Sequence, residues 1–243
     1  MGVRLSEDFQ PGTLCPAAVF GGFMDTFSVF DIVGPRMIGP SSSHTAGAAK
    51  IALMARRIIG RPIREVRFTL YGSFAETGRG HGTDKALVAG ILGFAPDDSR
   101  IPNAYEYAKE SGVLINMIMS DEPTRHPNTV KIEACDDNDR WTEVMGESIG
   151  GGNILITEID HLAVELSGDY PTLIIRHHDE PGVIAEVSHV LAQMRVNIAF
   201  MRVFRHGRGE DAYMCIETDT EVTEGMQMII VQLCHSIRQL IVV

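Results

Sequence analysis

Apolar residues recur along residues 44–59 at the spacing of one face of a helix. The segment reads HTAGAAKIALMARRII, and its large apolar side chains include Ile51, Met54 and Ile58. This spacing predicts an amphipathic helix. The many small residues in it predict close packing against another element.

The segments that follow have the patterns of strands. In REVRFTLYGSF, Val66, Phe68 and Leu70 alternate with more polar positions, which predicts a half-buried strand. A glycine-rich loop, GRGHGT, is expected next, and then a short helix, DKALVAGIL, that Gly93 ends. The apolar patches GVLINMIMS and TVKIEACD indicate further strands or buried turns, and a glycine run in SIGGGN precedes one more strand.

The pattern changes after the polar, turn-forming stretch SGDYP at residues 167–171. From there the chain reads strand, helix, strand, strand, helix, strand. This βαββαβ order indicates a ferredoxin-like arrangement of roughly 70 residues. We therefore predict an α/β (α+β) protein with a mixed domain at 24–167 and a ferredoxin-like domain at 171–243.

Composition is that of a globular protein able to bury a core. The 243 residues are 44% hydrophobic and 22% charged, with a formal net charge of −11. An acidic chain is a poor binder of nucleic acid or of anionic membrane surfaces. No apolar run approaches the ~18 residues that a membrane span needs. We expect neither nucleic acid nor membrane among its partners.

The four cysteines are scattered, at positions 15, 135, 215 and 234, and none belongs to a C-x-x-C motif. The sequence therefore predicts no metal or iron–sulfur site in this chain. Unpaired cysteines of this kind fit a reducing compartment, so we expect a cytoplasmic protein.

The first 23 residues are interpreted as a leader or extension ahead of a possible start at Met24. An apolar stretch begins at Leu14, but Glu7 and Asp8 precede it and Pro16 interrupts it. A secretory signal peptide has a different pattern.

Hydroxyls and an imidazole crowd the predicted start of the 44–59 helix. A helix N-terminus presents unpaired backbone amides to an anion, and histidine exchanges protons near neutral pH. One serine would suffice as a cap, and three with a histidine exceed that need. The candidate site residues are Gly39, Ser41, Ser42, Ser43, His44 and Thr45.

Two glycine-rich motifs add candidates. In GRGHGTD, His81 and Gly82 are followed by Thr83 and Asp84; the spacing matches neither a P-loop nor a dinucleotide fingerprint. In SIGGGN, three consecutive glycines either hold a carboxylate or only turn the chain; they are Gly150, Gly151 and Gly152.

Three segments together, FDIVGPRMIGPSSSHTAGAAK, LYGSFAETGRGHGTDKA and GESIGGGNI, resemble the β chain of the iron–sulfur-dependent bacterial L-serine dehydratases. The resemblance runs from about Phe27 to the C-terminus. It implies a lyase that converts L-serine to pyruvate and ammonia. It also implies a partner α subunit whose cysteines hold a 4Fe–4S cluster, and a β chain that is inactive alone.

Under this resemblance the site residues hold L-serine and move its α-proton. The hydroxyls and amides beginning at Ser41 would bind the carboxylate. The base is either His44, His81 or a serine alkoxide, and the sequence does not choose among them.

The stretch LIIRHHDEPGVIAEVSHVLAQMRVNIAFMRVFR resembles an ACT domain, a small regulatory fold that pairs side by side and binds an amino acid at the shared edge. The resemblance implies self-association and an effector site. Its candidate residues are Asp179, Gly182, Val183, Ile184 and Asn197. For Asp179, a helix cap ahead of Pro181 is an equally good interpretation.

Two other functions compete with the enzyme. The chain is alternatively a non-catalytic amino-acid-binding regulatory protein, because parts of the first domain resemble a regulatory domain of some phosphoglycerate dehydrogenases. A Ser-His hydrolase is disfavoured, since no G-x-S-x-G motif accompanies the serines. The remaining histidines, His161 and His126 among them, are interpreted as structural or surface residues.

Overall fold

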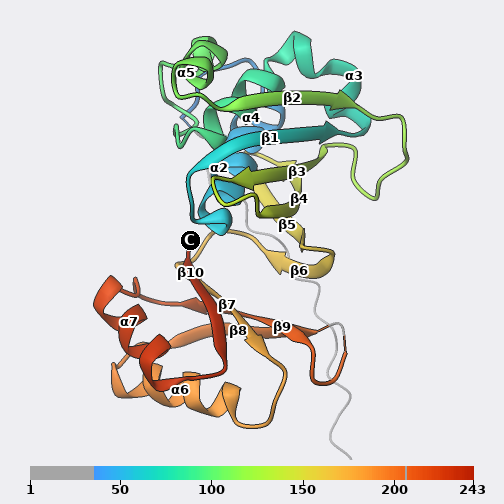
Figure 1. The fold of residues 1–243 in the computed structure, drawn as a ribbon. Helices are drawn as coiled ribbons and strands as arrows, with labels where there is room; N and C mark the ends of the chain where they lie inside the picture. Colours follow the sequence, from blue (N-terminus) through green and yellow to red (C-terminus); the bar gives the residue numbers. More distant parts are fainter. Residues whose placement is uncertain (1–35, 206) are drawn as a thin grey trace, which may run out of the picture.

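The computed structural model describes residues 36–205 and 207–243. The expected leader at 1–23 and the beginning of the predicted first domain lie outside the described residues. Two β-sheets, each carrying helices on one face, follow one another along the chain (Figure 1). This arrangement confirms the predicted mixed α/β class.

The first sheet has six strands in the order β2-β1-β3-β4-β5-β6. Only β1 and β2 run parallel, and every other neighbouring pair is antiparallel. The strands are β1 (Ile63–Leu70), β2 (Leu114–Met119), β3 (Thr129–Asp136), β4 (Trp141–Gly150), β5 (Asn153–Ile159) and β6 (Leu162–Leu166).

Helices cover one face of this sheet and connect its two parallel strands (Figure 1). A π-helical turn, η1, leads directly into the first long helix, so the two form one continuous element. The helical elements are η1 (Ser42–Gly47), α2 (Ala48–Ile59), α3 (Gly72–His81), α4 (Thr83–Ile91), the 3₁₀ turn η2 (Ile101–Asn103) and α5 (Ala104–Glu110).

The predicted helix over 44–59 and its close packing are confirmed. α2 packs against α4, and the contact is so tight that a Cβ at Gly90 would lie 2.3 Å from the carbonyl oxygen of Ala49. The predicted strand is confirmed as β1, whose Val66, Phe68 and Leu70 side chains are all fully buried.

The predicted loop GRGHGT is wrong. The strand ends at Leu70, α3 begins at Gly72, and helix continues through His81. Only Gly82, with φ +70°, breaks the helical path before α4 begins at Thr83. Glycine lowers helix propensity but does not prevent a helix when tertiary packing holds it. The patterns also missed α5 and β6, and the strand β4 that precedes the glycine run.

The second sheet has the order β10-β7-β9-β8, and all its neighbouring strands are antiparallel. This confirms the predicted βαββαβ arrangement. Its elements are β7 (Thr172–His178), α6 (Val183–Gln193), β8 (Ile198–Arg205), β9 (Asp211–Thr218), α7 (Glu224–Leu233) and β10 (Ile237–Val242).

The central strands of the second sheet, β7 and β9, are buried on both faces, which explains the continuous apolar run in β7. Leu173 and Met214 belong to the core under α6 and α7. Ile174, Tyr213 and Cys215, on the opposite face, belong to the same core cluster as the first domain. The C-terminal strand β10 ends between the two sheets (Figure 1). No helix in the described part of the chain is long and apolar enough to cross a membrane.

Candidate active site

The hydroxyl-rich motif forms a capped helical turn. Ser41 has extended backbone angles, and its Oγ accepts a hydrogen bond from the His44 amide at 3.1 Å. The hydroxyls of Ser42 and Ser43 are partly exposed and make no hydrogen bond within the described residues. One serine is therefore used as the cap, and the hydroxyls of Ser42 and Ser43 are not needed for capping.

Gly39 brings the preceding chain against this turn. Its φ is +142°, and a Cβ there would lie 2.3 Å from Cγ2 of Thr45. Thr45 is buried, and its Oγ1 donates a hydrogen bond to the carbonyl oxygen of His81 at 3.2 Å. The start of η1 is thus tied to the end of α3.

His44 is held between two serines. Its Nε2 lies 3.0 Å from Ser73 Oγ, and its Nδ1 lies 3.4 Å from Ser41 Oγ. The edge of Phe74 contacts the ring, with 5.4 Å between the centroids. Burial, and then the neighbouring charge of His81, lower the pKa of His44 below its ordinary value of 6.5. The imidazole is therefore neutral at neutral pH.

His81 has a defined tautomer when neutral. Its Nδ1 lies 3.2 Å from the carbonyl oxygen of Thr77, one turn earlier in α3. A carbonyl oxygen only accepts hydrogen bonds, so Nδ1 carries the proton and Nε2 keeps its lone pair. The ring centroids of His44 and His81 are 5.0 Å apart. The structure thus brings together two histidines that are 37 positions apart in the sequence.

A cavity of about 280 Å³ opens beside His81, whereas His44 and the three serines before it are not among its lining residues. Its lining combines the segment around Gly39, the segment Gly80–Gly82 and the ammonium group of Lys85. The lining includes Gly39, Thr45, Gly80, His81, Gly82 and Lys85. The cavity offers a cation for a small carboxylate and an imidazole for proton transfer.

A larger cavity of about 560 Å³ lies beyond the start of α3, lined in part by Gly72, Glu76, Asp121 and Glu122. Its three acidic side chains would repel a carboxylate. Chemistry rather than size therefore assigns the candidate site to the smaller cavity beside His81.

Thr83 and Asp84 follow His81 in sequence but do not line this cavity. Thr83 is fully buried, and its Oγ1 has no hydrogen-bond partner among the residues that the structure describes. Asp84 accepts a hydrogen bond from the Tyr105 hydroxyl at 3.4 Å. The helical rather than looped path of this motif turns both side chains away from the cavity wall.

Gly150 is the last residue of β4, and Gly151 and Gly152 form the turn to β5; their φ values are +106°, +63° and +84°. None of them lines the cavity beside His81.

The strand β4 nevertheless contacts η1, the turn that carries His44. Ser148 is fully buried, and a Cβ at Gly47 would lie 2.0 Å from its Oγ. This Oγ has no hydrogen-bond partner in the described part of the chain. The Ser148 amide donates to the carbonyl oxygen of Asn128 at 2.9 Å, and Asn128 Oδ1 is also buried without a partner. Ser73, Asn128 and Ser148 were missed by the sequence analysis. Ser73 stands inside the quoted YGSF segment, but it was assigned to a strand that ends before it.

The predicted effector residues lie at the start of α6 and of β8. The helix opens at Gly182, with φ +106°, and has no side-chain cap. Asp179 is therefore not the cap that the alternative interpretation expected. Its carboxylate accepts a hydrogen bond from Arg205 at 2.9 Å, which holds the pKa of Asp179 below its usual value. Asn197 donates to Asp219 at 2.6 Å.

At the N-terminus of α6, Val183 is buried and Ile184 is 47% exposed. The first backbone amides of α6 thus receive no hydrogen-bond acceptor from a capping side chain. The exposed apolar side chain of Ile184 lies beside them.

The cysteines that the structure describes do not form a site for an iron–sulfur cluster. The described cysteines, Cys135, Cys215 and Cys234, are all buried, and none belongs to a group of metal-ligating side chains within the described residues.

Comparison with known proteins identifies the family of the chain. A family model described as serine dehydratase beta chain matches residues 26–159, and a model of the ACT domain matches 171–235. The chain is 46% identical over 197 residues to the probable L-serine dehydratase beta chain of Bacillus subtilis, covering 81% of this chain and 89% of that one. It is 42% identical over 207 residues to the L-serine dehydratase beta chain of Peptoniphilus asaccharolyticus, covering 84% and 92%.

A weaker similarity connects the chain to the D-3-phosphoglycerate dehydrogenase of Bacillus subtilis, at 28% identity over 181 residues. That match covers 73% of this chain but only 34% of the dehydrogenase. The two beta chains match at higher identity and along nearly their whole length. The protein belongs to the family of serine dehydratase beta chains, with an ACT domain as its C-terminal part.

Proposed function

We propose that this chain is the β subunit of an L-serine dehydratase, a lyase that acts together with an α subunit. The overall reaction removes water from L-serine, and the resulting enamine tautomerises to an imine that hydrolyses to pyruvate and ammonia. The observation that supports this most directly is the contact between the His44 and His81 rings, with His81 lining a cavity that Thr45 and Lys85 also line.

His81 is the proposed base for the α-proton. Its Nδ1 hydrogen bond to Thr77 leaves Nε2 as the acceptor, and His81 lines the cavity. A general base needs a neutral imidazole with a free lone pair within about 3 Å of the proton. His44 is the proposed positioning partner, since hydroxyls contact both of its nitrogens.

The serine carboxylate is proposed to lie at the start of η1. The hydroxyls of Ser42 and Ser43 and the first helical amides are the donors that η1 itself offers. The Lys85 ammonium lines the cavity beside His81 and is the proposed cation for the carboxylate. Thr45 and Gly39 fix the turn against His81. Thr83 and Asp84 are proposed to support the path of the chain after His81 rather than to contact substrate.

A 4Fe–4S cluster is proposed to belong to the α subunit. This follows from the buried, dispersed cysteines of the described chain and from the beta-chain names of the two relatives. A cluster iron with an open coordination position would act as a Lewis acid. The role of the β chain is to bind and orient the amino acid and to accept its proton.

The C-terminal domain is proposed to be a regulatory unit at 171–243, following a serine dehydratase unit at 24–167. The uncapped N-terminus of α6 is the proposed effector site, with Asp179 and Asn197 at its rim. Dimerisation is proposed through β8, which is an edge strand with exposed Phe200 and Val203. The enzyme is proposed to be cytoplasmic.

The test is anaerobic co-expression with a candidate α chain, one that carries the cysteines proposed to hold the 4Fe–4S cluster. The heteromer is expected to release pyruvate from L-serine, and each isolated chain is expected to release none. A heteromer with an intact cluster that leaves serine unchanged would overturn the proposal.

A non-catalytic amino-acid-binding protein is the second candidate, favoured by the similarity to part of D-3-phosphoglycerate dehydrogenase. That function predicts binding of an amino acid by this chain, measured by calorimetry, with no pyruvate under any pairing.

A further inference from the structure

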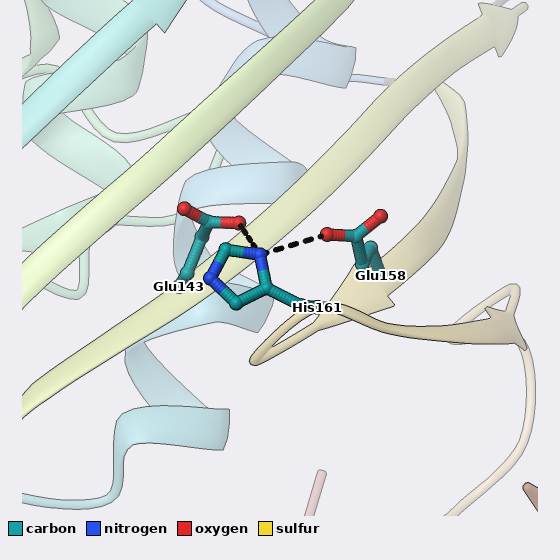
Figure 2. Close-up of side chains that lie close together, drawn as sticks. All are labelled: Glu143, Glu158 and His161. Atoms are coloured by element: carbon teal, nitrogen blue, oxygen red, sulfur yellow. Dashed lines mark ion pairs between the residues drawn. The ribbon is translucent and has the colours of Figure 1, made fainter. Parts of the chain in front are cut away.

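Three side chains on the open face of the six-stranded sheet bring carboxylates and an imidazole together outside the candidate active site. Glu143 lies on β4, Glu158 on β5 and His161 in the turn to β6 (Figure 2). His161 Nδ1 is 3.1 Å from Glu143 Oε1 and 3.5 Å from Glu158 Oε1. One ligand atom of each residue lies within 4.8 Å of the other two. We propose that this trio binds a divalent metal ion such as Zn²⁺.

The turn that carries His161 is held in place from two sides. Asp160 and His161 have φ values of +47° and +64° and connect β5 to β6 as a two-residue turn. Asp160 accepts a hydrogen bond from the Glu143 amide at 3.1 Å and another from the Tyr213 hydroxyl at 3.1 Å. The imidazole is therefore positioned over the two carboxylates before any ion binds, which reduces the cost of ordering the ligands.

The surrounding charge is negative. Glu133 and Glu143 stand directly opposite each other on β3 and β4, and Lys131 lies 3.6 and 3.5 Å from them. Lys131 approaches Glu143 Oε2, which leaves Oε1 facing His161. Arg67 pairs with Glu133 at 3.7 Å. Lys131 and Arg67 thus face three carboxylates, Glu133, Glu143 and Glu158, and the remaining negative charge favours a bound cation.

An ion can reach the trio from solvent and complete its coordination there. The side chains of Glu143 and Glu158 are 15% and 31% exposed, whereas that of His161 is 78% exposed. A cavity of about 230 Å³, lined in part by Trp141 and Thr142, adjoins Glu143 and His161. Three protein ligands of nitrogen and oxygen type, with room for water, suit Zn²⁺ or Mn²⁺. Nothing in this proposal depends on the proposed dehydratase activity.

The test is calorimetric titration of Zn²⁺ into the full chain, purified without a histidine tag. The wild type is expected to bind one ion. His161→Ala, Glu143→Gln and Glu158→Gln are each expected to weaken binding at least about tenfold, because each removes a ligand. His189→Ala removes an exposed histidine of α6 and is expected to leave binding unchanged.

Melting temperature gives an independent readout. Zn²⁺ is expected to raise that of the wild type and of His189→Ala, but not that of His161→Ala, because only a bound ion stabilises the folded state. The two glutamine variants keep the size of the side chain and are expected to fold. A wild type that binds no Zn²⁺, or a His161→Ala or Glu158→Gln variant with wild-type affinity, would overturn the proposal.

Discussion

The His44 and His81 rings lie 5.0 Å apart at an interplanar angle of 35°. The two residues come from different helices, and Thr45 ties those helices together through the His81 carbonyl oxygen. Two imidazoles this close resist carrying two protons at once. The pair is thus suited to hold a neutral acceptor beside the cavity.

The pKa of His44 is expected to lie below 6.5 in the folded chain. Burial is the largest cause, and the neighbouring His81 adds to it. Because the neutral form is favoured, His44 should remain unprotonated at pH 7 and take up its proton only as the pH falls further. NMR titration of the imidazole protons measures this directly.

His81→Asn removes the second cause and leaves the first. The pKa of His44 in that variant is expected to rise towards 6.5 without exceeding it. A wild-type His44 that titrates at or above 6.5 would show that the ring is not buried as described.

Packing of α2 on α4 is expected to tolerate no side chain at Gly90. Gly90→Ala would place a Cβ 2.3 Å from a backbone oxygen and 2.7 Å from Ala52 Cβ, so the free energy of unfolding should fall by roughly 1–3 kcal/mol. Gly80→Ala is the matched control, because no described atom outside its own helix backbone and chain neighbours lies within 4 Å of the added Cβ. Its stability should be unchanged or higher by up to about 1 kcal/mol. Urea denaturation compares the two, and equal stability would refute the close contact.

Self-association is expected to depend on the β8 edge. Val203 is 38% exposed on this strand, and a charge buried in a strand-to-strand contact is costly. Val203→Lys should therefore convert a dimer to a monomer in sedimentation velocity. Met228→Lys, on the 63% exposed Met228 of α7, should leave the dimer intact. If Met228→Lys gave a monomer and Val203→Lys did not, the dimer contact would lie on the helices rather than on β8.

Periodicity predicted most of the fold because the side chains that face the cores follow it. Val66, Phe68 and Leu70 alternate in sequence and point to one face of β1. The same reasoning failed for the GRGHGT segment. Its glycines suggested a loop, whereas tertiary packing holds residues 78–81 in α3.

The candidate site was only partly predictable. The sequence indicated His44 because serines and a threonine flank it, and His81 because glycines flank it. Ser148 lies against Gly47 of η1, and Asn128 is hydrogen-bonded to Ser148. Both contacts depend on the packing of β4 against η1 and on the pairing of the strands, which no local sequence pattern shows. The Glu143, Glu158 and His161 trio depends in the same way on strand register, so the expectation that the chain has no metal ligands rested on spacing alone.

The most direct test of the central claim is the rate of pyruvate formation by a heteromer whose β chain carries His81→Asn. Cluster content and folding are checked by absorbance and circular dichroism, and His189→Ala serves as the control. We predict that kcat falls roughly 10²- to 10⁴-fold in His81→Asn and stays at the wild-type value in His189→Ala. A His81→Asn heteromer that turns over L-serine at the wild-type rate would contradict the assignment of this histidine as the base.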